Sequence, residues 1–235
     1  MIRELPAYAR VYLASVALLA LLSGTMLARA GLPATLAVNF LIVTGFAMVA
    51  HSFPVPAPRH QSYQVTLPFI VIAAASFSLL QLVAFTVLIH AAEQLRARRR
   101  WYIQCFNVCN YFLSAAAAGV AYRQAVHVLP GSLVAEAEAA LAAGCVFVLA
   151  NRFLLAGALW LARGLSPARS SLFEPELLAT DLIITWIAAP MLLLAVILGM
   201  WTVLISSGPL FLARPALVHL LEGPAKASQA ETRAA

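Results

Sequence analysis

Three amide side chains recur at three-residue spacing in one apolar segment of this chain. Gln104, Asn107 and Asn110 stand in the stretch WYIQCFNVCNY, and Tyr111 follows the last of them. Residues three apart lie along one face of a helix. The spacing therefore predicts either hydrogen bonds between helices, worth roughly 0.6 kcal/mol each in a membrane, or a polar pocket for a small ligand.

Arg152 is the costliest residue to place inside an apolar helix. It precedes Arg163 by about three turns of helix, which corresponds to roughly 16 Å along the axis. A charge at that depth needs a partner or a function. We expect a structural ion pair with Asp181, with Glu93 as the next candidate, or a site where Arg152 binds an anionic ligand.

His90 and Glu93 are the one pair at a spacing that could place two metal ligands on a single helical face. No second His or Cys pair accompanies them, so the sequence predicts no metal site. No Ser/His/Asp set, glycine-rich phosphate loop, H-E-x-x-H motif or pair of intramembrane aspartates can be assembled. We therefore expect no catalytic residues, no cofactor and no enzymatic activity.

The composition indicates the environment in which these residues must be held. The chain has 235 residues, of which 63% are hydrophobic and 10% charged, and its mean hydropathy is +0.91. A water-soluble globule could not bury that much apolar surface, so the sequence predicts a membrane protein. The net charge of +6 lies mostly between apolar runs, which favours topology signals and lipid headgroup contacts over nucleic-acid binding.

One block marks a membrane surface. Four arginines are followed directly by an aromatic pair: Arg96, Arg98, Arg99, Arg100, Trp101 and Tyr102. Basic clusters beside apolar segments stay on the cytoplasmic side, and Trp and Tyr lie at headgroup depth. We expect a cytoplasmic N-terminus, with this block and the proline-rich stretch SFPVPAPRHQSY on the same side.

The apolar runs predict an all-α, polytopic membrane domain over residues 1–222, with about seven to eight helical elements and a disordered polar tail at 223–235. Expected helices cover residues 11–28, 34–50, 101–125, 134–162, 177–206 and 210–221, with Gly208 and Pro209 ending the fifth and Arg214 and Pro215 interrupting the last. Three prolines at alternate positions predict an extended backbone in the stretch SFPVPAPRHQSY. Ser171 with Glu174 offers a capping box before the helix at 177.

Residues 65–95 can form one long helix or two short helices joined by a break. Ser78 and Gln81 form an S-x-x-Q capping box in the middle of the run, and Thr66 with Pro68 opens its first half. A hairpin also places more Lys and Arg on the cytoplasmic side. We predict the hairpin, whose first arm, at residues 68–77, would be only about 15 Å long and therefore re-entrant or half-buried.

These motifs together resemble a known class of membrane region. FPVPAPR at residues 53–59, the following QSYQV and the segment WYIQCFNVCNY after an arginine-rich turn are similar to the multi-helix sensor region of bacterial cyclic-di-GMP signalling proteins. Those proteins typically carry a GGDEF diguanylate cyclase or an HD-type phosphodiesterase as output. The similarity spans about residues 34–161, including Asn151, but Phe77-Ser78 replaces the usual Gly-Pro at the break, and no output motif follows Leu221. The helix, break, helix arrangement is also similar to S components of energy-coupling-factor vitamin transporters.

The resemblance implies a sensor or input module in a bacterial inner membrane that binds a small ligand or a partner protein. The candidate ligand-binding residues are Gln81, Gln104, Asn107, Asn110, Tyr111, Asn151 and Arg152. Its partners would be the lipid bilayer and either a separate signalling protein or a second copy of the chain. The alternative is a small-molecule transporter or its substrate-binding subunit, suggested by the half-helix beside a proline-rich loop. A purely structural membrane protein is the third possibility.

Overall fold

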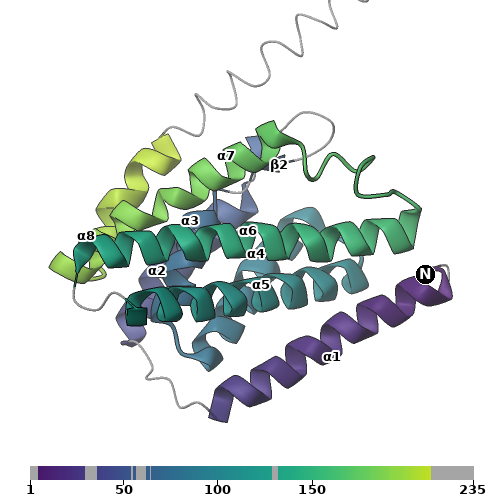
Figure 1. The fold of residues 1–235 in the computed structure, drawn as a ribbon, viewed down its shortest axis with the longest axis horizontal. Helices are drawn as coiled ribbons and strands as arrows, with labels where there is room; N and C mark the ends of the chain where they lie inside the picture. Colours follow the sequence, from purple (N-terminus) through teal and green to yellow (C-terminus); the bar gives the residue numbers. More distant parts are fainter. Residues whose placement is uncertain are drawn as a thin grey trace, which may run out of the picture.

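The computed structural model describes residues 5–29, 36–53, 55–56, 62–63, 65–128 and 132–212 (Figure 1). The predicted interruption at Arg214 and Pro215, the polar tail at 223–235 and the centre of the proline-rich loop lie outside the described residues. Within them, the architecture is all-α, as predicted. Three helical stretches, Ala7–Met26, Leu133–Arg163 and Pro175–Leu198, are long and apolar enough to cross a membrane.

Helices account for nearly all of the described elements. In chain order they are α1 (Ala7–Arg29), α2 (Ala37–Ser52), α3 (Leu67–Ser76), α4 (Leu79–Ala97), α5 (Trp101–Val128), α6 (Leu133–Arg163), α7 (Pro175–Trp186) and α8 (Ala188–Leu198), followed by a helix at Thr202–Leu212. Two short strands, β1 (Val55–Pro56) and β2 (Ser62–Tyr63), pair antiparallel inside the predicted extended stretch. The membrane domain is therefore a helical bundle with one small hairpin at its surface.

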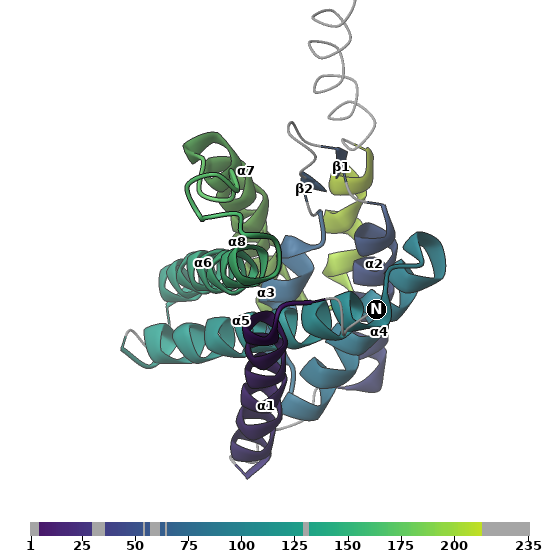
Figure 2. The same cartoon turned by 90° about the vertical axis from the view of Figure 1, so that its right-hand side faces the viewer.

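The predicted break inside residues 65–95 is confirmed at Phe77 and Ser78. The Ser78 hydroxyl accepts a hydrogen bond from the Gln81 backbone, and the Gln81 side chain accepts one from the Ser78 backbone, which completes the capping box. His51 touches Thr66 at the start of α3 and also His90 in the last third of α4. The two helices therefore run in opposite directions, as a splayed hairpin (Figure 2).

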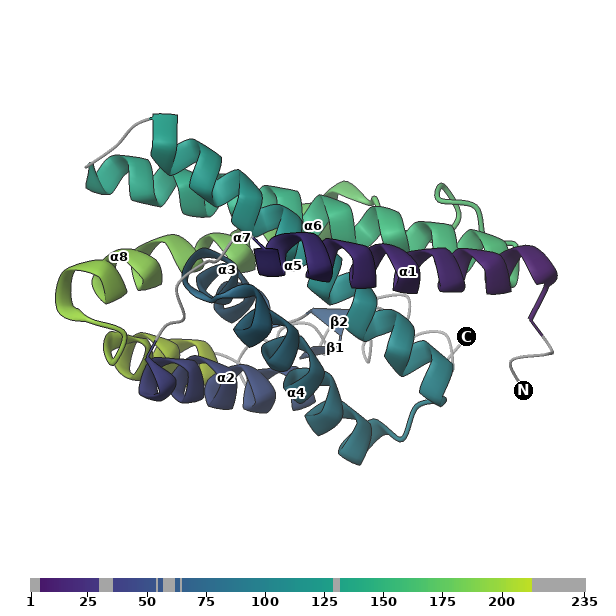
Figure 3. The ribbon, with the colours of Figure 1, turned by 90° about the horizontal axis from the view of Figure 1, so that it is seen from below.

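Helix α3 is the centre of the bundle. Its 10 residues are too few to span a membrane at about 1.5 Å per residue, and the run from Leu67 to Ala74 is buried throughout. Helices α2, α5, α6, α7 and α8 all contact it, and Figure 3 shows it enclosed between the α5–α6 pair and α2. This enclosure is what allows a half-length helix, because its terminal backbone groups are shielded from lipid by protein.

The expected single helix at residues 177–206 is wrong, because the helical stretch is interrupted at Ile187, which keeps helical dihedral angles, and ends at Leu198. Pro190 has no backbone N–H, and its ring would clash with the carbonyl four residues earlier, which belongs to Trp186, the last residue of α7. Gly199 adopts a positive φ of 101° and ends α8. The predicted break at Gly208 and Pro209 is also wrong, since helix Thr202–Leu212 continues through both.

The helix that follows the predicted capping box at Ser171 and Glu174 starts later than a box with Ser171 as its N-cap would require. Helix α7 begins at Pro175, with Glu174 itself as the N-cap residue. Proline is favoured at the first helical position because its fixed φ suits the helix and the missing N–H has no partner there anyway. Both residues of the predicted box therefore precede the first turn.

One end of the bundle gathers the connections that the sequence predicts to be cytoplasmic. The start of α1, the α4–α5 turn and the α6–α7 loop lie together there (Figures 1 and 3). Tyr12 of α1 donates a hydrogen bond to the carbonyl of Leu154 at 2.8 Å and contacts the ring of Phe106. The arginine side chains of the α4–α5 turn are exposed at this end, so it is the more positively charged one.

The packing of α5 against α3 predicts a sharp contrast between two helical glycines. A Cβ on Gly119 would lie 2.7 Å from the backbone oxygen of Ala74, whereas one on Gly45 would meet no atom within 4 Å. Overpacking costs about 1–3 kcal/mol, more than the roughly 1 kcal/mol that alanine gains over glycine in a helix. Gly119→Ala should lower the melting temperature of the purified protein, while Gly45→Ala should leave it unchanged or raise it. Equal melting temperatures for both variants would contradict the close α3–α5 approach.

Candidate functional site

A polar cavity of about 200 Å³ lies where α2, α3, α4, α5, α6 and α7 meet. Its polar lining residues are His51, His90, Glu93, Arg99, Asn107, Asn110, Tyr111, Asn151, Arg152 and Asp181, and Leu67, Leu155 and Leu172 complete the wall. The cavity thus collects polar groups from helices that are otherwise mostly apolar.

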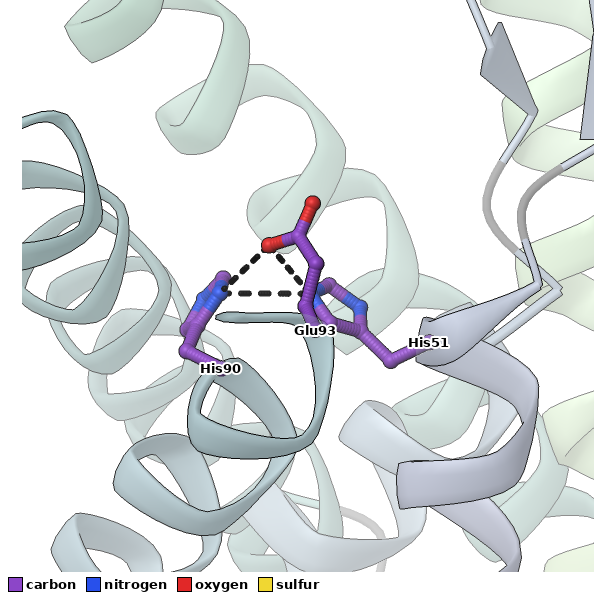
Figure 4. A group of neighbouring side chains, drawn as sticks. All are labelled: His51, His90 and Glu93. Atoms are coloured by element: carbon purple, nitrogen blue, oxygen red, sulfur yellow. Dashed lines mark hydrogen bonds and ion pairs between the residues drawn. The ribbon is translucent and has the colours of Figure 1, made fainter. Parts of the chain in front are cut away.

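One wall of the cavity is built from α2 and α4. His51 stands in the last turn of α2, and His90 and Glu93 lie one turn apart on α4, so that all three side chains meet. We call these three residues the histidine–glutamate cluster (Figure 4). Arg99 Nε donates to Glu93 Oε1 at 3.1 Å, and Arg96 ties the end of α4 to α2 by donating to the carbonyl of Ser52.

The opposite wall is built from α6, α7 and the loop between them. The guanidinium of Arg152 donates to the Asp181 carboxylate, with Nε at 3.1 Å from Oδ2, and also to the carbonyl of Leu172. The side chains of Arg152 and Asp181 are only 8% and 13% exposed. A buried pair of this kind stays together because neither charge could remain there alone.

The amides of α5 line the floor between these walls and divide into two roles. Asn110 Nδ2 donates to Asn151 Oδ1 at 2.7 Å, and Gln104 Nε2 donates to the carbonyl of His90 at 2.6 Å, so both hold helices together. Asn107 also lines the cavity, yet it makes no hydrogen bond to any other described residue. Its amide is therefore available to a ligand.

Tyr111 packs against both histidines. Its ring centroid lies 4.6 Å from that of His90 and 5.4 Å from that of His51, both edge-on, and 5.7 Å from Phe147. Such edge-to-face contacts stabilise a fixed ring orientation. The aromatic ring thus packs both imidazoles in place.

The structure places the predicted ligand-binding residues in three groups. Asn107, Asn110, Tyr111, Asn151 and Arg152 line the cavity, and Gln104 lies beside it, bonded to His90 and Glu93. Gln81 does not reach it, because its side chain caps the N-terminus of α4 at the other end of that helix. For the ion pair, Arg152 is joined to Asp181, whereas Glu93 contacts the histidines and Arg99.

Two contributors to the site were missed from the sequence. His51 stands in the last turn of an apolar helix, directly before the proline-rich loop. From the sequence, that position predicts the end of a helix and not a binding site. Arg99 was assigned only to the membrane surface together with Arg96, Arg98, Arg100, Trp101 and Tyr102. Trp101 is 60% exposed, in keeping with an interface position, and the half-exposed Arg99 also contacts Glu93 through its Nε.

A larger hollow of about 560 Å³ lies between α1, α4 and α5, lined mainly by apolar residues such as Leu21, Val83 and Phe112. It contains no charged side chain, and most of the outer surface of α1 beside it is exposed. A surface of that kind suits contact with lipid. We therefore assign polar-ligand chemistry to the smaller cavity.

Comparison with protein-family models, with curated proteins and with solved structures finds no match to this chain. The function is therefore inferred from the cavity and its side chains. The geometry there combines two charged clusters, three amides and a tyrosine on six elements.

The pairing of Arg152 with Asp181 predicts strong coupling between their substitutions. Removing one partner of a buried pair costs about 3–5 kcal/mol, because the other charge is left uncompensated. Arg152→Ala and Asp181→Ala should each lower the free energy of unfolding by this order, and the double variant should lose clearly less than their sum. Arg169→Ala, which removes an exposed arginine of the adjacent loop, is the control. Additive losses in denaturant titrations would show that the pair does not contribute as a unit.

Proposed function

We propose that this protein is an integral membrane sensor that binds one small polar molecule in the cavity between α2 and α7 and signals through helix packing. The proposal rests chiefly on one observation: a largely apolar bundle holds a cavity lined by two carboxylates, three asparagines, the buried Arg152 and the half-exposed Arg99. Charged side chains inside a membrane bundle are costly and mark functional sites. Helix association alone needs far fewer of them.

Size and charge restrict the class of ligand. A volume of about 200 Å³ is below the roughly 300 Å³ at which drug-sized pockets begin. Arg99 and Arg152 are balanced by Glu93 and Asp181, which all lie on the lining. We therefore expect a neutral or zwitterionic molecule about the size of an amino acid, rather than a multiply charged anion.

Occupancy can be transmitted because the two walls belong to different helices. The α2–α4 wall carries the histidine–glutamate cluster, and the α6–α7 wall carries Arg152 and Asp181. A ligand that contacts both walls favours whichever helix arrangement it binds more tightly. An input module of this kind acts on a separate signalling protein or on a second copy of the chain, in keeping with the resemblance to cyclic-di-GMP sensor regions.

Asn107 offers the cleanest test of ligand binding. It lines the cavity and has no partner among the described residues, so Asn107→Ala should leave the melting temperature of the apo protein nearly unchanged. The purified protein is screened in detergent against amino acids, amines, nucleobases and sugars by thermal shift, and hits are titrated by calorimetry. A hit for the wild type should bind at least tenfold more weakly to Asn107→Ala, a loss of about 1.4 kcal/mol.

The matched control is Asn39→Ala, which removes an amide near the start of α2, about 18 Å along the helix from His51. This variant should bind every hit as the wild type does. A screen without hits, or equal affinity for wild type and Asn107→Ala, would count against a ligand site here.

A second candidate function is transport of the same class of molecule. It is favoured by α3, whose N-terminal residue Leu67 lines the cavity. Broken helices whose ends reach a central cavity are where transporters place substrate sites. Uptake of a labelled hit into proteoliposomes distinguishes the two functions, since a sensor binds its ligand without accumulating it in the lumen.

The charge distribution supports a bacterial inner-membrane location with the arginine-rich end in the cytoplasm. In a variant without Cys105, Cys109 and Cys145, a cysteine replacing the exposed Arg169 in the α6–α7 loop should react with an impermeant maleimide only in inverted vesicles. A cysteine replacing Val128, which is 75% exposed at the far end of α5, should react only from the opposite side. The reverse pattern would place the arginine-rich end outside.

A further inference from the structure

The histidine–glutamate cluster brings three donor atoms unusually close together. His51 Nε2 lies 3.2 Å from His90 Nδ1 and 3.5 Å from Glu93 Oε2, and His90 Nδ1 lies 3.4 Å from the same carboxylate oxygen. Figure 4 shows the three atoms pointing at one another from α2 and α4. The residues are 2%, 1% and 8% exposed, so water does not separate them.

When Glu93 is ionised, hydrogen bonds alone cannot satisfy all three contacts. A hydrogen bond requires one hydrogen, directed along the line between donor and acceptor. Suppose that Glu93 is a carboxylate and that His51 Nε2 and His90 Nδ1 each donate an N–H to it. These two N–H groups then also face each other, and two donors repel. If either nitrogen lacks its hydrogen, its lone pair faces the lone pairs of the carboxylate. With Glu93 ionised, every assignment of the hydrogens therefore leaves one of the three contacts repulsive.

A cation placed between the three atoms would make all three contacts favourable, because each atom would direct a lone pair to the cation. Zinc bonds to imidazole nitrogen and carboxylate oxygen are about 2.0–2.2 Å long, and tetrahedral angles then place neighbouring ligand atoms about 3.3–3.5 Å apart. The three separations observed here match this spacing. Two histidines and one carboxylate are also a donor set that zinc uses with an open fourth position.

We propose that His51, His90 and Glu93 bind one divalent transition-metal ion of the zinc type, with its fourth coordination position open to the polar cavity. All three residues line that cavity, so the fourth ligand is water or the cavity's own ligand. The site stands apart from the proposed sensor function, since metal binding needs only these three side chains.

Neighbouring groups orient two of the three ligands, whereas Nε2 of His90 has no hydrogen-bond partner among the described residues. His51 Nδ1 lies 3.3 Å from the hydroxyl of Thr66, which fixes the ring so that Nε2 points to the cluster. Arg99 Nε donates to Oε1, the carboxylate oxygen that does not face the histidines, while Oε2 faces them and also accepts a hydrogen bond from Gln104 Nε2 at 3.3 Å. Partners in such positions commonly change metal affinity 10- to 100-fold when they are removed.

Metal content of the purified protein tests the proposal directly. The detergent-solubilised full chain is stripped with a chelator, incubated with Zn²⁺, desalted and analysed by mass spectrometry for metal. We expect about one zinc per chain in the wild type, and at least tenfold weaker binding for His51→Ala, His90→Ala and Glu93→Gln. His127→Ala, which removes an exposed histidine at the end of α5, should bind zinc as the wild type does.

A cobalt-loaded protein separates metal ligation from a structural role. His51→Cys and His90→Cys keep a metal ligand, because thiolate also binds zinc and cobalt. With Co²⁺, the wild type should show the intense visible bands of tetrahedral coordination, and each cysteine variant should add a sulfur-to-cobalt charge-transfer band. Absence of zinc uptake by the folded wild type, or uptake that is equal in the wild type and all three ligand variants, would overturn the proposal.

Discussion

The burial of charge in an apolar bundle is the constraint on which the rest of this structure depends. Each buried ionised group in the cavity lining must meet an opposite charge or a carbonyl, because burial among apolar helices removes most of its hydration. Arg152 meets Asp181 and the carbonyl of Leu172, and Glu93 meets Arg99 and two imidazoles. These requirements fix the distance between α6 and α7 and between α2 and α4.

The two polar clusters consequently hold separate pairs of helices together. The contact between His51 and His90 joins α2 to α4, and the ion pair between Arg152 and Asp181 joins α6 to α7. Helix α5 lies between them and supplies the amides and Tyr111. A ligand of the proposed kind would lie between these two clusters, both of which line the cavity.

Local chemistry made part of this architecture predictable. The break before α4 follows from a capping box four residues long, and the partner of Arg152 follows from short loops that make consecutive helices antiparallel neighbours. His51 could not be placed from the sequence, because 39 residues and a splayed hairpin separate it from His90. The breaks at Ile187 and Gly199 were missed since Pro190 and Gly199 sit within continuous apolar runs, where hydropathy gives no boundary.

The complete enclosure of α3 has a consequence for how the chain is made. A half-length helix cannot rest in lipid by itself, and one of the helices that cover it, α8, is synthesised roughly 120 residues later. At about 5–20 residues per second, α3 waits on the order of 6–24 s before that neighbour emerges. During this interval its terminal backbone groups must be kept out of lipid, either within the insertion machinery or by contact with α2 and α4. We therefore expect α3 to reach its final position only after α8 has been synthesised.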